Sequence, residues 1–281
     1  MAENIVLITG CSSGIGRALA LAYQQRGDTV YATARRPETL DALPEGIHRI
    51  TLDVNNHSAT QQAIQHIERN SGRIDVLINN AGFGLMGPLV ELPTTAIREQ
   101  LETNVVAPIA LTQAALPLLR EAARVNKAAR VVNIGSVSGI LTTPFSGAYC
   151  ASKSAVHAMS DALRMELAPF GIHVITIQPG AIRSEFGNNS AESVNRWLRP
   201  DSLYMPIKSA IEARAQASQQ DPTTAEDFAR IFIDAVMQNP PAAVTRIGNG
   251  SRMMPLVKRW LSTARLDRLL SKRFKLDQLG Q

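Results

Sequence analysis

The stretch TGCSSGIG, residues 9–16, lies between the apolar run NIVLIT at 4–9 and a segment of helical periodicity near 14–26. A glycine at such a junction allows a tight turn, and another lets backbone N–H groups approach a pyrophosphate at the positive end of the helix. A glycine-rich turn without a ligand is the alternative, because the motif alone is weak evidence. Its place at the first strand-to-helix junction favours a dinucleotide site. The residues expected to form it are Gly10, Ser12, Ser13, Gly14, Ile15 and Gly16.

Short, apolar, β-branched runs alternate with helix-like stretches along most of the chain. The expected strands are 4–9, 29–34, 48–54, 74–80, 129–136, 173–179 and 242–247. The expected helices lie near 14–26, 57–70, 95–124 and 149–169, and TTAE at 223–226 is typical of a capping box that opens another helix. Buried strands that alternate with helices pair in parallel through right-handed crossovers. We therefore predict an α/β fold with one Rossmann-type, doubly wound parallel sheet of about seven strands, flanked by helices.

The composition is that of a soluble globular protein, with 281 residues, 45% of them hydrophobic and 19% charged. No repeat or linker divides the chain, so we predict one domain at 1–250 and an extension at 251–281. No basic leader precedes the first apolar run, and no stretch reaches the ~18 uncharged apolar residues of a spanning helix. Cys11 and Cys150 fit neither a disulfide framework nor a zinc pattern, so no metal site and a cytoplasmic location are expected.

The net charge of +5 is concentrated in the extension at 251–281, which has eight basic residues against two acidic ones. Because the rest of the chain is close to neutral, no nucleic-acid partner is predicted. Met253, Leu256, Trp260 and Leu261 recur at helical spacing beside the basic residues. Such an amphipathic segment would lie on an anionic membrane surface, cover a substrate cleft or pack on a neighbouring subunit. The sequence leaves these three interpretations open.

The stretch AYCASK, residues 148–153, places Tyr149 and Lys153 four residues apart in a segment that favours helix. Four residues are about one turn, so the two side chains share a face. An ammonium group ~5 Å from a phenolate contributes ~3 kcal/mol at an effective dielectric constant of about 20. That would lower the tyrosine pKa by about two units, before burial opposes the shift. The pair alone is equally typical of a solvent-exposed helix face.

The ordered set of motifs resembles the short-chain dehydrogenase/reductase family over residues 4–184. Three residues separate the first two glycines of TGCSSGIG, NNAG (79–82) follows the fourth strand, and PG (179–180) follows the sixth. Ser136 ends the fifth strand, thirteen residues before the tyrosine of Tyr-x-x-x-Lys. The resemblance implies reversible hydride transfer between a nicotinamide cofactor and a carbonyl or alcohol carbon.

The resemblance also implies the role of each site residue. Tyr149 would transfer a proton to the reacting oxygen, Ser136 would hydrogen-bond the same oxygen, and Lys153 would lower the tyrosine pKa and hold the nicotinamide ribose. Asn104 would anchor a water that links Lys153 to solvent, with a structural amide that kinks the helix as the alternative. The expected catalytic residues are Asn104, Ser136, Tyr149 and Lys153. The further expected cofactor contacts are Asp53, Asn80, Ala81, Gly82, Tyr149, Lys153, Pro179, Gly180, Ile182 and Ser184, which stands where the family commonly has threonine.

The second strand ends in ATARRP, and the side chain just past such a strand faces the adenosine ribose. An acid there would bind the 2′-hydroxyl, whereas Arg35 and Arg36 suit a 2′-phosphate through charge-assisted hydrogen bonds. Ser13 would add a hydroxyl group. We therefore predict NADP(H) rather than NAD(H), against the alternative that both arginines are simply solvated. Asp53 resembles the family's acid that binds the adenine amino group, and a capping role is its alternative.

The stretches NNAGFGLMGPL and PFSGAYCASK most resemble the branch of 17β-hydroxysteroid and retinol dehydrogenases. That resemblance implies a hydrophobic substrate (a steroid, a retinoid or an aliphatic aldehyde or ketone) and a homodimer or homotetramer. Residues 181–222, with Phe186, Trp197 and Tyr204, form either an apolar flap over the substrate or ordinary core packing. Two rivals are a nucleotide-binding regulatory protein, which needs no Tyr-x-x-x-Lys, and a sugar-nucleotide-modifying relative, which usually has two residues between the first glycines.

Overall fold

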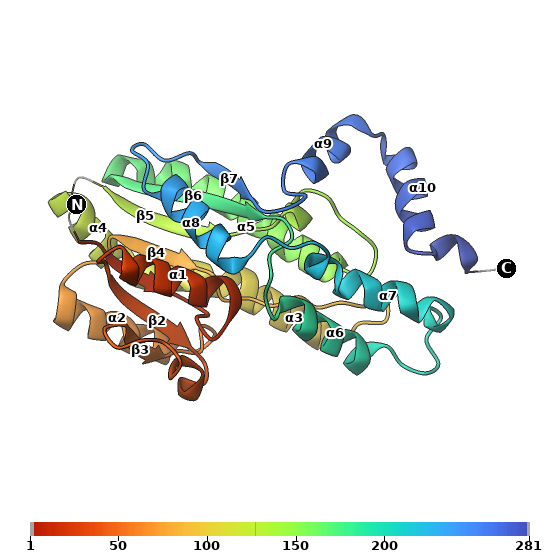
Figure 1. Ribbon diagram of the computed structural model, residues 1–281, viewed down its shortest axis with the longest axis horizontal. Coiled ribbons are helices and arrows are strands. Elements are labelled where there is room, and N and C mark those ends of the chain that lie inside the picture. Colours follow the sequence, from red (N-terminus) through yellow and green to blue (C-terminus); the bar gives the residue numbers. More distant parts are fainter. Residues whose placement is uncertain (1–2, 127, 280–281) are drawn as a thin grey trace.

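The computed structural model describes residues 3–126 and 128–279 and contains one seven-stranded sheet in the order β3-β2-β1-β4-β5-β6-β7 (Figure 1). The strands are β1 Ile5–Ile8, β2 Thr29–Ala34, β3 His48–Thr51, β4 Val76–Asn79, β5 Ala129–Ile134, β6 Ile172–Pro179 and β7 Val244–Ile247. Every neighbouring pair is parallel. The doubly wound parallel sheet predicted from the alternation is therefore confirmed.

Helices cover both faces of the sheet in the described part of the chain, and others lie beyond its carboxyl edge (Figure 1). The covering helices are α1 Gly14–Gln25, α2 His57–Ser71, α4 Ala107–Asn126, α5 Gly147–Leu167 and α8 Ala225–Val236. α3 Thr94–Leu101 packs on the start of α5, where its Ala96 lies in a cluster with Ala148, and the others are α6 Phe186–Trp197, α7 Lys208–Ala215, α9 Met253–Trp260 and α10 Thr263–Arg273. The short helical turns are η1 Pro37–Leu40, the π-helix η2 Glu102–Val106, η3 Val137–Gly139, η4 Ala168–Phe170, η5 Met205–Ile207, η6 Ala217–Gln219 and η7 Leu276–Gln278.

Several local details differ from the sequence-based expectation. The strand expected at 48–54 ends at Thr51, and the one expected at 129–136 ends at Ile134, so Ser136 follows the strand as the N-cap of η3. The helix expected at 95–124 is α3 and α4 joined by the π-helix η2, because one turn there is wider. The capping box opens one residue later than TTAE suggests, since Thr224, not Thr223, is the N-cap of α8. Its hydroxyl accepts a hydrogen bond from the backbone N–H of Asp227 at 3.1 Å.

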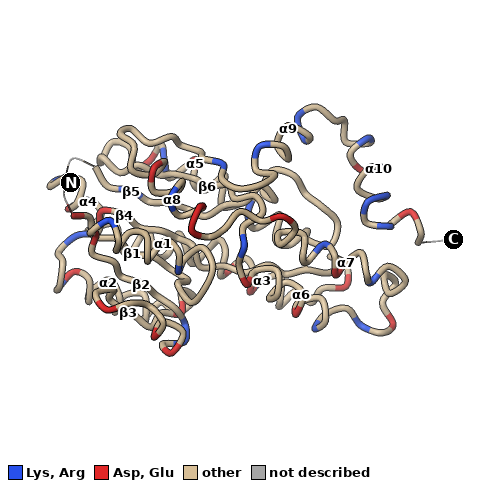
Figure 2. Tube along the Cα trace, in the orientation of Figure 1, with Lys and Arg blue, Asp and Glu red and all other residues tan. Residues whose placement is uncertain are grey.

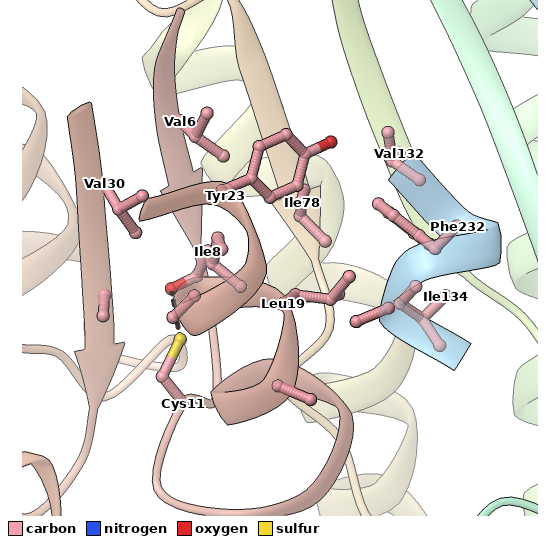
Figure 3. Packing of buried hydrophobic residues seen from close by; sticks show 14 of the residues in the cluster. Val6, Ile8, Cys11, Leu19, Tyr23, Val30, Ile78, Val132, Ile134 and Phe232 are labelled. Atoms are coloured by element: carbon pink, nitrogen blue, oxygen red, sulfur yellow. Dashed lines mark hydrogen bonds between the residues drawn. The ribbon is translucent and has the colours of Figure 1, made fainter. Parts of the chain in front are cut away.

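Apolar side chains fill both faces of the sheet because successive strand residues point to opposite sides. Val6 and Ile8 pack with Leu19 of α1 and Phe232 of α8 on one face (Figure 3). Leu7 packs on the other face, in the cluster that α2 and α4 cover. β1 is thus buried on both sides, as a central parallel strand should be.

A third apolar cluster lies beyond the carboxyl edge of the sheet. It joins residues of the segment 181–222, such as Val194 and Ile211, to Leu266 and Leu270 of α10. The ring of Phe274, just after α10, lies 6.4 Å from that of Phe145, which precedes α5. The extension therefore packs against the body of the protein through one side of α10. Figure 2 shows its Lys and Arg residues along α9 and α10.

One continuous helical stretch in the described residues, 94–126, is long and apolar enough to cross a membrane, with a mean hydropathy of 1.2 in its most apolar window. The sequence expectation was that no such stretch exists. Of that window, 44% is buried inside the protein, where α4 places Leu111, Leu118 and Leu119 against the sheet. A core helix of this kind passes the same length and composition criteria.

Candidate active site

A cavity of about 660 Å³ lies where the carboxyl ends of the strands meet. This is the edge at which open parallel sheets bind their ligands, because the loops after neighbouring strands converge there. Most of the residues predicted for the site line this one cavity. They are Gly10, Ser12, Ser13, Gly14, Ile15, Arg35, Asp53, Asn80, Ala81, Gly82, Ser136, Tyr149, Lys153, Pro179, Gly180, Ile182 and Ser184. Gly16, Arg36 and Asn104 do not line it.

The glycine loop is shaped by close backbone contacts. Gly10 and Gly14 have φ of +73° and +54°, a region that side chains with a Cβ rarely adopt. A Cβ on Gly16 would lie 2.2 Å from the carbonyl oxygen of Gly10, so Gly16 serves the packing of α1 on the loop. Asn80 fixes the loop from β4, since its Nδ2 donates to the carbonyls of Thr9 and Gly10 at 2.8 and 3.1 Å.

This cradle fits the dinucleotide that the sequence implies. The open turn leaves Ser12 and Ser13 on the cavity wall at the N-terminus of α1, where unpaired N–H groups and the helix dipole favour a pyrophosphate. Asp53 also lines the cavity and accepts a hydrogen bond from the backbone N–H of Asn55 at 3.0 Å. The helix α2 is instead capped by Asn56, whose side chain accepts from the backbone N–H of Ala59 at 3.0 Å, so contact of Asp53 with the cofactor stays a prediction.

The two arginines after β2 are not equivalent. Arg35 lines the cavity, whereas the Arg36 side chain is 77% exposed and lies 3.9 Å from Glu38 in an ion pair outside the cavity. Consecutive residues of an extended chain point to opposite sides, which explains the difference. Of the two residues predicted to contact the cofactor, only Arg35 faces the site.

Tyr149 and Lys153 lie on the first two turns of α5 and share a face, as their spacing predicts. The Lys153 Nζ lies 5.9 Å from the centre of the Tyr149 ring and donates to the carbonyl of Ile134 at 2.7 Å. Both side chains are buried, and burial lowers the pKa of Lys153 to about 8.

The expected fall of the tyrosine pKa is wrong for this structure. Burial raises the pKa of Tyr149 to about 12, because removal from water penalises the phenolate more than the nearby groups stabilise it. The Ser136 hydroxyl, by its hydrogen bond with the phenol, and the more distant charge of Arg214 act in the opposite direction. The cationic neighbour is visible in the local sequence, whereas the apolar groups that surround the phenol come from distant segments.

Asn104 is buried behind the cavity, in the π-helix η2. Its side chain accepts from the backbone N–H of Phe83 at 3.1 Å and donates to the carbonyl of the same residue and to Ser152 Oγ. A separate void of about 10 Å³, about the size of one water molecule, is lined by Asn104, Lys153 and Asn133. The Asn104 amide therefore has a structural role, since it joins η2 to Phe83 and Ser152. The void lies between Asn104 and Lys153, the place expected for the water that would link Lys153 to solvent.

His157 was not predicted, although it lies four residues after Lys153 on the same helix face. Its Nε2 accepts a hydrogen bond from the backbone N–H of Ser136 at 3.3 Å. Burial, and then the charge of Lys153, lower the pKa of His157 to about 4, so the ring is neutral at neutral pH and keeps its acceptor nitrogen. The repeated i, i+4 spacing from Tyr149 was the signal that would have found it.

One part of the cavity is lined mostly by apolar side chains from the segment 181–222 and the extension. Phe186 of α6 lies 5.2 Å from the Tyr149 ring, and Leu266, Leu270 and Phe274 form another wall. Trp197 and Tyr204 instead pack in apolar clusters outside the cavity lining. Both interpretations of the segment 181–222 therefore hold for different residues. The extension lines the cavity, so of its three interpretations the structure shows the one in which it covers a substrate cleft.

Two arginines in this part of the cavity, Arg214 and Arg273, were also missed, because nothing in the local sequence marks them. Within residues 3–126 and 128–279, no group of three or more His, Cys, Asp or Glu side chains is placed to hold a metal ion. Both cysteines are free and buried.

Comparisons with known proteins agree with this geometry. The family model for short chain dehydrogenases matches residues 4–195. The human 17-beta-hydroxysteroid dehydrogenase type 1 is 32% identical over 277 residues, 92% of this chain and 81% of that protein. A short-chain dehydrogenase from Streptomyces avermitilis superposes with a TM-score of 0.77 at 30% identity, over 99% of this chain and 97% of that one.

An NADP complex is among the similar solved structures. RhlG of Pseudomonas aeruginosa, solved with NADP at its active site, has a TM-score of 0.73 and 28% identity, over 89% of this chain and 96% of that one. The motif order, the parallel sheet and these matches lead to one conclusion: the chain belongs to the short-chain dehydrogenase/reductase family of oxidoreductases.

Proposed function

We propose that this protein is an NADP(H)-dependent oxidoreductase that interconverts a carbonyl and an alcohol on a hydrophobic substrate: a steroid, a retinoid or an aliphatic aldehyde or ketone. The observation that carries the proposal is that Ser136, Tyr149 and Lys153 line the same cavity as the glycine loop. A binding protein without turnover would not need a buried phenol, a hydroxyl and an ammonium group at one point of a nucleotide cavity.

The chemistry divides between the cofactor and the protein. The nicotinamide supplies or accepts the hydride at the reacting carbon when it is bound. In the reduction, Tyr149 donates its proton to the carbonyl oxygen while Ser136 donates a hydrogen bond to that oxygen, so both act where negative charge develops. The raised pKa keeps Tyr149 protonated at neutral pH, which is the form that this direction needs. Lys153 stabilises the resulting phenolate, and a water held near Asn104 returns the proton.

The choice of NADP(H) rests on Arg35. Its guanidinium group is exposed on the cavity wall after β2 and has no ion pair with an acid among the described residues. A 2′-phosphate at this position would neutralise the charge of the guanidinium group, whereas a 2′-hydroxyl would not. The NADP found with the similar RhlG supports the same choice.

The hydrophobic substrate is supported by the cavity walls, which include Phe186, Leu266 and Phe274. The similar protein named as a steroid dehydrogenase supports an apolar substrate as well. The absorbance of NADPH at fixed protein concentration, with a panel of steroid, retinoid and aliphatic carbonyls, tests the proposal. Consumption of NADPH with at least one apolar carbonyl is expected, and no consumption with any of them would overturn it.

Location and assembly belong to the same proposal. We expect a cytoplasmic protein that touches anionic membranes through α9, because Met253, Leu256 and Trp260 are exposed there beside Lys258 and Arg259. We also expect a homodimer or homotetramer. Exposed apolar residues near α4 and α5, Val106, Met165 and Phe170, support an interface on those helices, and sedimentation equilibrium would measure its stoichiometry.

A further inference from the structure

Two guanidinium groups line the apolar part of the cavity. Arg214 lies on α7, and Arg273 is the last residue of α10. Both line the cavity together with Leu266 and Phe274, although an apolar substrate gives no reason for positive charge at this place. Arg273 is exposed to solvent, whereas the partly buried Arg214 needs a partner for its charge.

Arg214 is held in position by hydroxyl groups instead of an acid. Its Nε donates to Thr143 Oγ1 at 2.6 Å, and its Nη2 donates to Ser146 Oγ at 3.0 Å. A guanidinium has five N–H donors, so most of those on Arg214 have no protein partner among the residues that the structure describes. The group is oriented and still has donors to offer.

The charge of Arg214 also has no counter-ion within the described part of the chain. Two acids line the cavity, Asp53 and Glu185, and neither forms an ion pair with Arg214 or Arg273. Burial lowers the pKa of Arg214, which reflects the cost of keeping a charge away from water. A ligand that brings a negative charge would remove that cost.

We propose that the substrate carries an anionic oxygen group, a carboxylate or a phosphate, a few bonds from its reacting carbonyl, and that Arg214 binds this group with Arg273 beside it. The inference rests on the proposed function and narrows its substrate class. Arg214 contacts Ser146, three residues before Tyr149, and both Arg214 and Tyr149 line the cavity, so an anion on Arg214 would share the cavity with the phenol. The planar guanidinium pairs with such groups through parallel hydrogen bonds, and the apolar walls take the rest of the chain.

Binding can be tested without turnover. Isothermal titration calorimetry with octanoate, octyl phosphate and octan-1-ol should show at least one anion bound about 10- to 100-fold more tightly than the alcohol, the effect of a charged hydrogen bond. R214Q should lose that preference, and R214K, which keeps the charge without the planar fork, should retain part of it. K208Q removes a charge from the same helix outside the cavity and should retain the preference fully.

Thermal unfolding shows whether each variant is folded. If R214Q is not folded, the binding preference of R214K is compared with that of the unmodified protein instead. Equal binding of the anions and the alcohol by the unmodified protein would overturn the inference. An unchanged preference in folded R214Q would overturn it as well. A preference for only one anion supports the site and identifies its ligand.

Turnover separates this inference from the proposed function. With NADPH, the kcat/KM for 4-oxodecanoate should exceed that for its methyl ester at least about 10-fold, and R214Q should bring the ratio close to one. Equal reduction of both compounds by the unmodified protein would overturn the anion site and leave the carbonyl reductase intact. No reduction of any carbonyl, with the anion preference present in calorimetry, would overturn the proposed function instead.

Discussion

Tyr149 illustrates how a single side chain depends on what surrounds it. Its ring lies 5.2 Å from that of Phe186, and burial raises its pKa to about 12 despite Lys153 close by. The environment therefore favours the neutral phenol. In the proposed reduction this form donates the proton, and the proposed reverse reaction would need Lys153 to stabilise the phenolate.

Replacement of Tyr149 by phenylalanine removes the proton donor and keeps the ring. For Y149F we expect kcat to fall about 10²- to 10⁴-fold, the usual contribution of general acid catalysis, while NADPH binding changes little. NADPH absorbance measures the first quantity and fluorescence of the bound cofactor the second. Activity within tenfold of the unmodified protein would mean that the proton comes from another group.

Arg35 and Arg36 provide a matched pair for the cofactor assignment. R35S should raise the KM for NADPH about 10- to 100-fold and change the KM for NADH little, because it removes a charged contact to the 2′-phosphate. R36S, whose side chain faces Glu38 outside the cavity, should change both by less than about threefold. Steady-state kinetics with both cofactors measures this, and equal effects of the two substitutions would contradict the assignment.

His157 predicts a pH dependence of stability. Its pKa of about 4 in the folded protein is below the ordinary value of ~6.5, so the unfolded chain binds more protons between these values. The contribution to stability is complete above pH 6.5 and is lost as the pH falls toward 4. H157Q should flatten this part of the profile in urea unfolding from pH 4.5 to 7, whereas H66Q, at an exposed position of α2, should leave it unchanged. An unaltered slope in H157Q would show that other groups cause it.

The sequence predicted which side chains lie together in the cavity, but it did not predict the direction of the pKa shift of Tyr149. Tyr149, Ser136 and Lys153 were identifiable because their spacing follows the elements that carry them. The direction of the tyrosine pKa was not, because desolvation depends on packing by Phe186 and others from distant segments. Arg214 was missed for the same reason, since α7 reaches the cavity only through tertiary structure.

The start of α1 forms one wall of the proposed cofactor site. The first turn of α1 packs closely against the glycine loop, because a Cβ at Gly16 would lie 2.2 Å from the Gly10 carbonyl oxygen and 2.5 Å from Asn80 Nδ2. The N-cap residue Ser13 makes no side-chain capping hydrogen bond. The loop is thus held by close packing instead of by a cap.

For G16A we expect a loss of about 1–3 kcal/mol in the free energy of unfolding, since backbone atoms must move to admit the methyl group. S13A should cost less than about 0.5 kcal/mol, because no capping hydrogen bond is lost. Urea unfolding of both variants without cofactor measures the difference. A G16A protein as stable as S13A would show that the loop adapts freely.

Most elements could be predicted from the sequence, because apolar strands and helical periodicity are local signals. The π-helix η2 between α3 and α4 could not be predicted, since one wider helical turn does not change the amino-acid composition. The N-cap of α8 is Thr224, one residue after the predicted Thr223, because both threonines are suitable N-cap residues. Adjacent residues of the same type are ambiguous until the turn is seen.

The whole molecule combines a nearly neutral body with a basic extension that has two different sides. One side of α10 contributes Leu266 and Leu270 to the cavity, whereas Met253 and Trp260 of α9 are 64% and 77% exposed. The sequence could identify an amphipathic tail. Its contact with the cavity depends on the path of the chain after β7, which no local pattern determines.

Membrane contact can be tested without disturbing the cavity. In co-sedimentation with vesicles of phosphatidylglycerol and phosphatidylcholine, the unmodified protein should bind at low salt. K258Q/R259Q should bind about 30-fold more weakly, at ~1 kcal/mol for each charge removed near the membrane. Neither residue lines the cavity, so NADPH binding is the control. Equal partitioning of both proteins, or binding that ignores salt, would remove the membrane proposal.

The cavity wall formed by Leu266, Leu270 and Phe274 has a practical consequence for anyone who handles the protein. An affinity tag, fluorophore or immobilisation linker joined to the C-terminal side of this wall would follow Phe274 closely in the sequence. The chain enters β1 at Ile5, at the sheet edge opposite the carboxyl ends of the strands. Fusions for purification or imaging therefore belong on the amino-terminal side.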